Sequence, residues 1–277
     1  TFASGTTAYA TTIENSETSV EVITETTSAN AKVTVSGNSN LKVGTNTVTV
    51  TVTAQNGDAK TYTITVTRKA SSDATLKSLT VSSGTLTPEF DGSKTEYTVS
   101  VPYSVSTITI GATVNNSEAT VTGAGDKELV VGRNVIEVKV TAGDKTAKTY
   151  TITVTREKDT VNTLKSLSLT NCTLSPTFNG NTTSYTCTVE NNVTETTVTA
   201  IATSSVATVS GAGTKQLAVG TNTINITVTS QSGSIKTYQV VVTRKASSDA
   251  TLKSLTVSNG TLTPEFDGSK TEYTVSV

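Results

Sequence analysis

The chain has no histidine, no methionine and no tryptophan among its 277 residues, and it has only two cysteines. Histidine is the side chain that most often acts as a general base near neutral pH, and it is also the commonest metal ligand. Two cysteines alone do not complete a structural zinc site. Carboxylates such as Glu96 and Glu118 fall at polar positions of a strand pattern or in turns, where they are normally solvated. We therefore expect no enzymatic activity, no cofactor and no metal site.

Charge of one sign and long apolar runs are also missing. The 21 basic and 22 acidic residues leave a net charge of −1, so the chain has no strong electrostatic footprint for nucleic acid or for an anionic membrane. No apolar run approaches the roughly 18–20 residues that cross a bilayer. We expect no nucleic-acid partner and no membrane insertion in this segment. The expected partners are neighbouring repeats or copies of the chain itself.

Threonine is abundant, and valine and isoleucine mostly occupy alternate positions between the threonines. β-branched residues favour strands because they pack well on a pleated, half-buried surface. The stretch KTYTITVTR occurs at residues 60–68 and again at 148–156, and KTYQVVVTR stands at 236–244. The spacing of 88 residues is the size of a small β-sandwich domain, so the chain is expected to be a tandem array.

The second copy of the repeat shows how each domain is expected to be built. A first strand is predicted at Leu76–Val81, and Leu86–Phe90 continues it past a glycine and a proline, at a sheet edge or a kink. Asp91-Gly92 is a two-residue hairpin signal, and it leads into a strand at Thr95–Val101. The last strand, at Thr149–Arg156, alternates tyrosine, isoleucine and valine on one face. We predict about seven strands in an all-antiparallel, immunoglobulin-like Greek-key β-sandwich.

Comparison of the sequence with itself at an offset of 88 residues divides the chain into four segments. The expected domains are 1–69, a repeat that lacks its first strand; 75–157 and 163–245, two complete repeats; and 251–277, the first two strands of a further repeat. These segments are called the first, second and third repeats and the tail.

Several motifs recur together: L-x-x-L-x-V, T-L-x-P-x-F, Y-T-V-x-V, V-G-x-N and K-T-Y-T-I-T-V-T-R. As a set they resemble the cadherin-like β-sandwich repeats of bacterial surface and secreted proteins, and the resemblance covers the whole chain. It implies immunoglobulin-like sandwiches in tandem on large extracellular proteins, with no activity of the repeat itself. The acidic calcium motifs of true cadherins are not found at the junctions, where Asp73 and Asp249 stand alone. Calcium-stiffened junctions are therefore not expected.

The two cysteines are predicted to form a disulfide. In a two-residue hairpin that turns at Asn179-Gly180 without a bulge, Cys172 and Cys187 face each other across the strands. Opposed residues have Cα atoms about 4.5–5.5 Å apart, which is within disulfide range. The alternative is two buried free thiols, since Pro176 could introduce a bulge that breaks this register. A disulfide would place the protein outside a reducing cytosol.

The first repeat invites a hypothesis about assembly. Without its first strand it would expose a hydrophobic groove and an unpaired sheet edge. The tail offers the missing residue types at the right spacing, namely Leu252, Leu255, Val257 and Leu262. Donation of the strand at 251–264 from another copy would make an open head-to-tail filament. The alternative is that residues 1–277 are a window on a longer array. Against donation, residues 265–277 duplicate residues 1–13.

The whole pattern predicts an extracellular stalk or fibre segment of a bacterial surface protein. The alternative function is an adhesin or ligand-binding module that uses inter-strand loops. Tyr103, the one aromatic residue without a counterpart in the other repeats, is the ligand-loop candidate. Arg68, Arg156 and Arg244 end the last strand of each repeat. They are either charged strand ends beside a linker or interdomain contacts.

Overall fold

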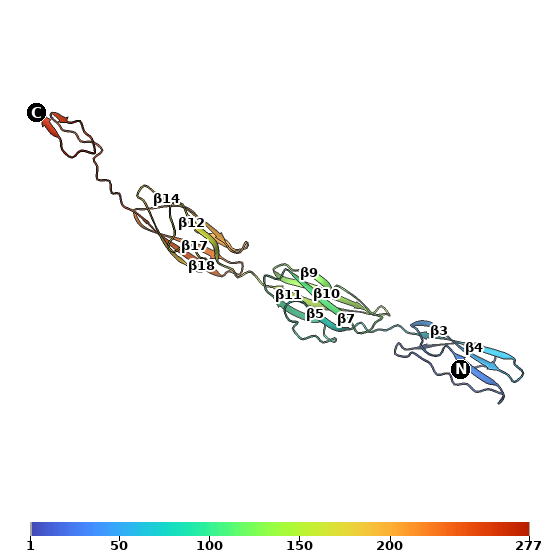
Figure 1. The fold of residues 1–277 in the computed structure, drawn as a ribbon. Helices are drawn as coiled ribbons and strands as arrows, with labels where there is room; N and C mark the ends of the chain where they lie inside the picture. The colour runs from blue at the N-terminus through green and yellow to red at the C-terminus, as the bar shows by residue number, and fades with distance from the viewer. Residues whose placement is uncertain (1, 277) are drawn as a thin grey trace. The chain divides into compact units, whose positions relative to one another are not determined.

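The computed structural model describes residues 2–276, which form strands, turns and extended segments without any helix. The chain divides into two compact units between Lys158 and Asp159, and each unit is described by itself. Figure 1 shows the strands gathered into separate groups along the chain, with the tail as the last group.

The strands follow the repeats. The first repeat contains β1 (Ala8–Ile13), β2 (Lys32–Ser36), β3 (Gly44–Thr53) and β4 (Ala59–Arg68). The second contains β5 (Leu76–Val81), β6 (Glu96–Val101), β7 (Thr107–Val114), β8 (Thr120–Thr122), β9 (Gly125–Glu128), β10 (Gly132–Thr141) and β11 (Ala147–Arg156). The third contains β12 (Leu164–Leu169), β13 (Ser184–Val189), β14 (Glu195–Ala202), β15 (Thr208–Ser210), β16 (Gly213–Gln216), β17 (Gly220–Thr229) and β18 (Ile235–Arg244). The tail contains β19 (Thr261–Thr263) and β20 (Thr274–Ser276).

The second repeat is a sandwich of two sheets. One sheet has the strand order β6-β11-β10-β8 and the other has the order β5-β7-β9. Every connection from β5 to β10 crosses between the sheets, and β10 and β11 form a hairpin within one sheet. The third repeat has the same arrangement, with orders β13-β18-β17-β15 and β12-β14-β16. The prediction of an all-β tandem sandwich fold is confirmed.

The core follows from the alternation of the sequence. In β11 the side chains of Tyr150, Ile152 and Val154 are fully buried, while the threonines between them are not. Val138 and Ile136 of β10 are buried opposite Tyr150 and Ile152. Full burial of one such side chain stabilises the fold by about 1.5–3 kcal/mol. The KTYTITVTR stretch is therefore a core strand.

One strand pair in each repeat is parallel, so the prediction of an all-antiparallel sheet was wrong there. β6 runs parallel to β11, and β1 and β13 run parallel to β4 and β18 in the same way. The chain enters β6 from the opposite sheet and not through a tight turn from β11. Because only a tight hairpin forces neighbouring strands to be antiparallel, this crossover leaves β6 free to run with β11.

The predicted first strand is split between the two sheets. β5 pairs with β7 in one sheet, whereas Thr87 exchanges two backbone hydrogen bonds of 2.9 and 2.8 Å with Thr98 of β6 in the other. The chain changes sheets at Gly84, whose φ of +76° suits a residue without a Cβ. Pro88 follows Thr87 and has no N–H with which to continue the ladder.

The arginines that end the last strands each hold two loops of their own repeat. Arg156 donates from Nε and Nη2 to the carbonyl of Tyr103, at 3.0 and 2.7 Å, and from Nη1 to the carbonyl of Leu129, at 2.9 Å. Arg68 and Arg244 make the same hydrogen bonds in the other repeats. The structure therefore gives these side chains a role within a repeat.

Candidate functional site: an open groove and an unpaired hairpin

The first repeat has one sheet where the others have two. Its described residues form the order β1-β4-β3-β2, with no counterpart of the β5-β7-β9 sheet. Residues 19–26 are the counterpart of β7, yet they form no strand beyond an isolated bridge between Ser19 and Ser39. β7 pairs with β5 along its length, and residues 2–69 contain no segment that corresponds to β5. One face of the sheet is therefore left largely uncovered.

The uncovered face forms a groove of about 810 Å³. Its apolar lining comes from both sides of the missing sheet: Phe2, Tyr9, Val22, Ile23, Val33, Val50, Val52, Tyr62 and Ile64. In the second repeat, the counterparts of Val50, Tyr62 and Ile64 have no exposed surface. The groove is the place that a β5-like strand fills in a complete repeat.

Two equivalent tyrosines show what the groove lacks. The hydroxyl of Tyr150 accepts a hydrogen bond from the N–H of Leu76 at 3.0 Å and donates to the carbonyl of Gly92 at 2.9 Å. The hydroxyl of Tyr238 makes the same two bonds in the third repeat. Tyr62 is only half-buried, and no hydrogen bond joins its hydroxyl to another described residue. A first strand would supply the missing backbone donor.

The tail is an unpartnered hairpin. Among the residues that the structure describes, β19 pairs only with β20, in a two-stranded sheet. Leu252 is 58% exposed and Val257 is 39% exposed, while Leu255 and Leu262 are half-buried. Their counterparts Leu76 and Leu79 in the second repeat are each 3% exposed. The four residues predicted for a donor strand thus remain accessible within the tail.

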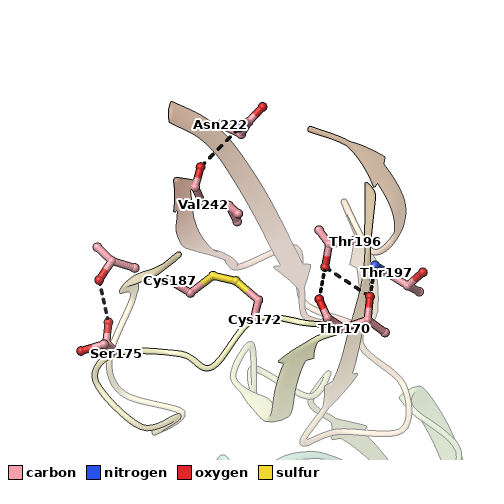
Figure 2. Close-up of a disulfide and its surroundings, with 9 residues drawn as sticks. Thr170, Cys172, Ser175, Cys187, Thr196, Thr197, Asn222 and Val242 are labelled. Carbon is pink, nitrogen blue, oxygen red and sulfur yellow. Dashed lines mark hydrogen bonds between the residues drawn. A yellow bond between two sulfur atoms is a disulfide. The ribbon is translucent and has the colours of Figure 1, made fainter. Parts of the chain in front are cut away.

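A disulfide joins Cys172 and Cys187 in the third repeat, with Cα atoms 5.7 Å apart (Figure 2). In the second repeat the same positions hold Gly84 and Val99. A Cβ built on Gly84 would lie 2.6 Å from Cγ1 of Val99. In the third repeat Cys172 replaces this glycine, and the residue with a positive φ is the preceding one, Asn171, at +58°.

The predicted register of this hairpin was wrong. Ser175 lies opposite Thr186, which shifts the pairing by two residues from the expected one. The N–H of Thr182 donates to the carbonyl of Asn179 at 2.9 Å, so the two central residues of the turn are Gly180 and Asn181, one position later than predicted. Cys172 still reaches Cys187 because it is not part of the pairing between Ser175 and Thr186. It forms an isolated β-bridge with Leu169.

Tyr103 has a structural partner. Its ring lies under the guanidinium of Arg156, with the centroid 4.9 Å from Cζ, and its side chain is half-buried. A ligand role for this loop stays a prediction. A shallow polar hollow of about 440 Å³ on the third repeat, between residues 214–216 and 222–225, does not include the Tyr103 loop.

Glu118 makes a contact that the sequence did not predict. Its carboxylate accepts hydrogen bonds from the N–H of Ser71, at 3.0 Å, and from Nδ2 of Asn15 in the first repeat, at 3.1 Å. These two bonds, and more weakly the charge of Arg68, hold the pKa of Glu118 below its ordinary value. The sequence held one indication that Glu118 has a role outside the common fold: it is not repeated, since the third repeat has Val206 at this position.

The linker acid Asp73 is also engaged. Its carboxylate accepts from Nδ2 of Asn115 at 2.7 Å, and from the hydroxyl and the N–H of Thr75 at 2.5 and 2.9 Å. The bonds to Thr75 are the main reason that the pKa of Asp73 lies below its ordinary value. Within residues 2–276 no group of three or more acidic or cysteine side chains is arranged to hold a metal ion.

The model of the cadherin-like beta sandwich domain matches residues 1–69, 76–157 and 164–245. The chain belongs to this family. The matches leave out the tail. A protein of Evansella cellulosilytica that carries the name "Putative membrane protein" is 34% identical over 98 residues. That segment covers 32% of the chain and 15% of the relative's length.

Solved cadherin ectodomains are among the structures to which the chain is similar. Drosophila N-cadherin EC1-3 has 9% identity and a TM-score of 0.33, with 87% of this chain and 99% of that chain covered. Mouse cadherin-23 EC22-24 has 10% identity and a TM-score of 0.27, with 87% and 96% covered. Among residues 2–276 there is no helix that could cross a membrane.

Proposed function

We propose that the chain is a structural segment of an extracellular stalk or fibre on a bacterial surface protein. The supporting observation is that the second and third repeats each bury a core of their own. Units of this kind, joined by short linkers, set length and carry load without a catalytic centre. The family match and the disulfide both fit a location outside the reducing cytosol.

Stretching of single molecules tests the load-bearing role. The second and third repeats should unfold in separate steps at different extensions, because each has its own core. The third should release less chain than the second, because the disulfide withholds the chain between its cysteines, which are 15 residues apart in the sequence, or roughly 50 Å at full extension. Reduction should remove the difference. Smooth extension without separate steps would contradict the proposal.

The groove supports a finer proposal, that copies assemble by strand donation. Residues 251–264 of one copy are the counterpart of the strand that the first repeat of another copy lacks, and we propose that the tail is the beginning of a further repeat used in this way. Leu252 and Leu255 would take the buried positions of Leu76 and Leu79, and the N–H of Leu252 would meet the Tyr62 hydroxyl.

Sedimentation of the full chain over a wide concentration range tests donation. Wild type should form open-ended oligomers that grow with concentration, and Leu255→Asp should stay monomeric because a charge cannot enter the groove. Lys253→Asp is the matched control, since the counterpart of Lys253 is the exposed Lys77. A wild-type monomer at every concentration rules out donation between copies and leaves the stalk role standing.

The alternative function, an adhesin that binds ligand through inter-strand loops, has weaker support. Tyr103 and its loop are held by Arg156 through main-chain hydrogen bonds. Tyr103→Ala should therefore change the stability of the second repeat before it changes any binding.

A further inference from the structure

The junction between the first and second repeats is attached on both sides. The N–H of Lys69 donates to the carbonyl of Ile13 in the first repeat, at 3.0 Å. The N–H of Asp144 in the second repeat donates to the carbonyl of Ser71, also at 3.0 Å. One residue, Ala70, lies between these two attachments, and planar peptide units leave only a few free backbone torsions there. A side-chain contact across Ala70 therefore restricts the freedom that remains.

Glu118 supplies such a contact. Its Oε1 and Oε2 lie 3.1 and 3.3 Å from Nδ2 of Asn15 in the first repeat. The same carboxylate accepts from the N–H of Ser71, a residue that is only 5% exposed. The carboxamide of Asn15 is oriented by its second bond, to the carbonyl of Lys69 at 3.0 Å. Because hydrogen bonds to a charged acceptor are stronger than neutral ones, Glu118 is a specific link between the two repeats.

Gly143 leaves room for this carboxylate. A Cβ built on Gly143 would lie 3.0 Å from Oε2 of Glu118 and 3.4 Å from the Cβ of Ala70, so a side chain there would crowd the junction. The third repeat has Gln231 at this position and Val206 at the position of Glu118. The second repeat thus carries two residues that fit a junction of this kind, and the third repeat carries neither.

The third repeat ends in the same way as the first. Asn191 is the counterpart of Asn15, and its carboxamide donates to the carbonyl of Lys245 at 3.0 Å. Arg244 donates from Nε and Nη2 to the carbonyl of Asn191, at 2.8 and 2.6 Å, which fixes this loop. The second repeat has Tyr103 at this position and so has no carboxamide there.

The linker after the third repeat also matches the first linker. Residues 244–277 differ from residues 68–101 at a single position, where Asn259 replaces Ser83. Ser247 is exposed, whereas its counterpart Ser71 is 5% exposed. The carboxamide of Asn191 and the N–H of Ser247 are the counterparts of the two donors that meet a carboxylate at the first junction. Asn191 and residues 244–247 are called the junction surface of the third repeat.

We propose that the junction surface of the third repeat docks a repeat of the second kind, one with glutamate at the position of Glu118 and glycine at that of Gly143. The glutamate accepts hydrogen bonds from the Asn191 carboxamide and from the N–H of Ser247. A repeat with valine in place of the glutamate offers no acceptor to these donors, so the carboxylate determines which kind of repeat docks. Neither load bearing nor strand donation is needed for this docking.

The first junction tests the recognition by the carboxylate. Both native cysteines are joined in a disulfide, so spin labels on Lys32→Cys and Thr122→Cys, at exposed strand positions, report the distance between the first and second repeats. Double electron–electron resonance on this full chain should give one narrow distance distribution. Adding Glu118→Val or Asn15→Ala should abolish the narrow peak, whereas Glu137→Val, which removes an exposed carboxylate, should keep it. A distribution that Glu118→Val leaves unchanged overturns the proposal.

The full chain extended after Val277 by a copy of residues 102–157 tests the docking. The tail and the copy then have the sequence of the second repeat except at Asn259, so the added repeat should fold as the second does. Labels on Thr208→Cys and on Thr122→Cys of the copy should give a narrow distance distribution. The same chain with Glu118→Val in the copy should give a broad one. Equal widths in these two chains overturn the proposal.

Discussion

The first and second repeats have closely similar strands in their second halves and differ in one missing strand. β3 and β4 keep the hairpin register of β10 and β11. Yet the first repeat buries only four apolar side chains, Leu41, Val48, Val50 and Val66, against 17 in the core of the second. The hairpin therefore keeps its register without a covering sheet. The buried core, by contrast, needs both sheets.

The difference extends to a segment that has its own strand pattern. Residues 19–26 read SVEVITET and alternate like β7, which reads TITIGATV, but only β7 is a strand. Val20 and Val22 are half-buried, whereas Ile108 and Ile110 are almost fully buried. Because a strand needs hydrogen-bonding partners at its edge, alternation alone does not produce one.

The largest expected difference between the two repeats concerns an isoleucine. Ile152→Ala should cost the second repeat about 2–5 kcal/mol, because it leaves a cavity in a closed core. Ile64→Ala should cost the monomeric first repeat less than half of that, because its side chain already borders the open groove. Hydrogen exchange of the amides in β11 and β4 measures both. Equal losses would show that the first repeat is closed in solution.

The third repeat extends the comparison, since it differs from the second by its disulfide. Cys172→Ala/Cys187→Ala should lower its free energy of unfolding by roughly 3 kcal/mol, the chain-entropy value for a loop of this length. The second repeat in the same molecule is the internal control and should not change in thermal unfolding followed by exchange. An unchanged third repeat would mean that packing around the cysteines compensates for the lost link.

The tyrosine hydroxyls give a smaller contrast. Tyr150→Phe removes two buried hydrogen bonds and leaves the N–H of Leu76 without its partner, at a cost of about 1–3 kcal/mol. Tyr62→Phe should change the first repeat by less than about 0.5 kcal/mol, the usual range for a site without such bonds. If the first repeat loses as much, a strand already occupies its groove.

The smallest expected effect is the acid sensitivity of the contact between Glu118 and Asn15. The folded-state pKa of Glu118 is lowered, so the contact contributes fully above the ordinary carboxyl pKa and is lost as the pH falls through the lower folded-state value. An NMR titration of the Asn15 side-chain amide should follow this loss. Glu118→Gln should remove the pH dependence. An Asn15 signal that titrates equally in this variant would assign the effect to another group.

The sequence by itself determined the 88-residue period, the position of most strands and the inward face of each. These features depend on residues that are close in the chain, such as the alternation from Tyr150 to Val154. It also predicted the pairing of Cys172 with Cys187, although the hairpin register behind that prediction was wrong by two residues. The error arose because the turn is centred on Gly180-Asn181, closed by the N–H of Thr182 on the carbonyl of Asn179, whereas the dipeptide signal predicted its centre at Asn179-Gly180.

Only the tertiary structure decided the parallel pairing of β6 with β11, the change of sheets at Gly84 and the loops held by Arg156. It also decided that Glu118 reaches Asn15, 103 residues away in the chain. In each case the partner lies in a distant segment, and local sequence carries no information about which distant backbone group will be near. For the same reason the segment 19–26 has the pattern of a strand but is not one: its neighbour, and not its own residues, determines whether its hydrogen bonds are made.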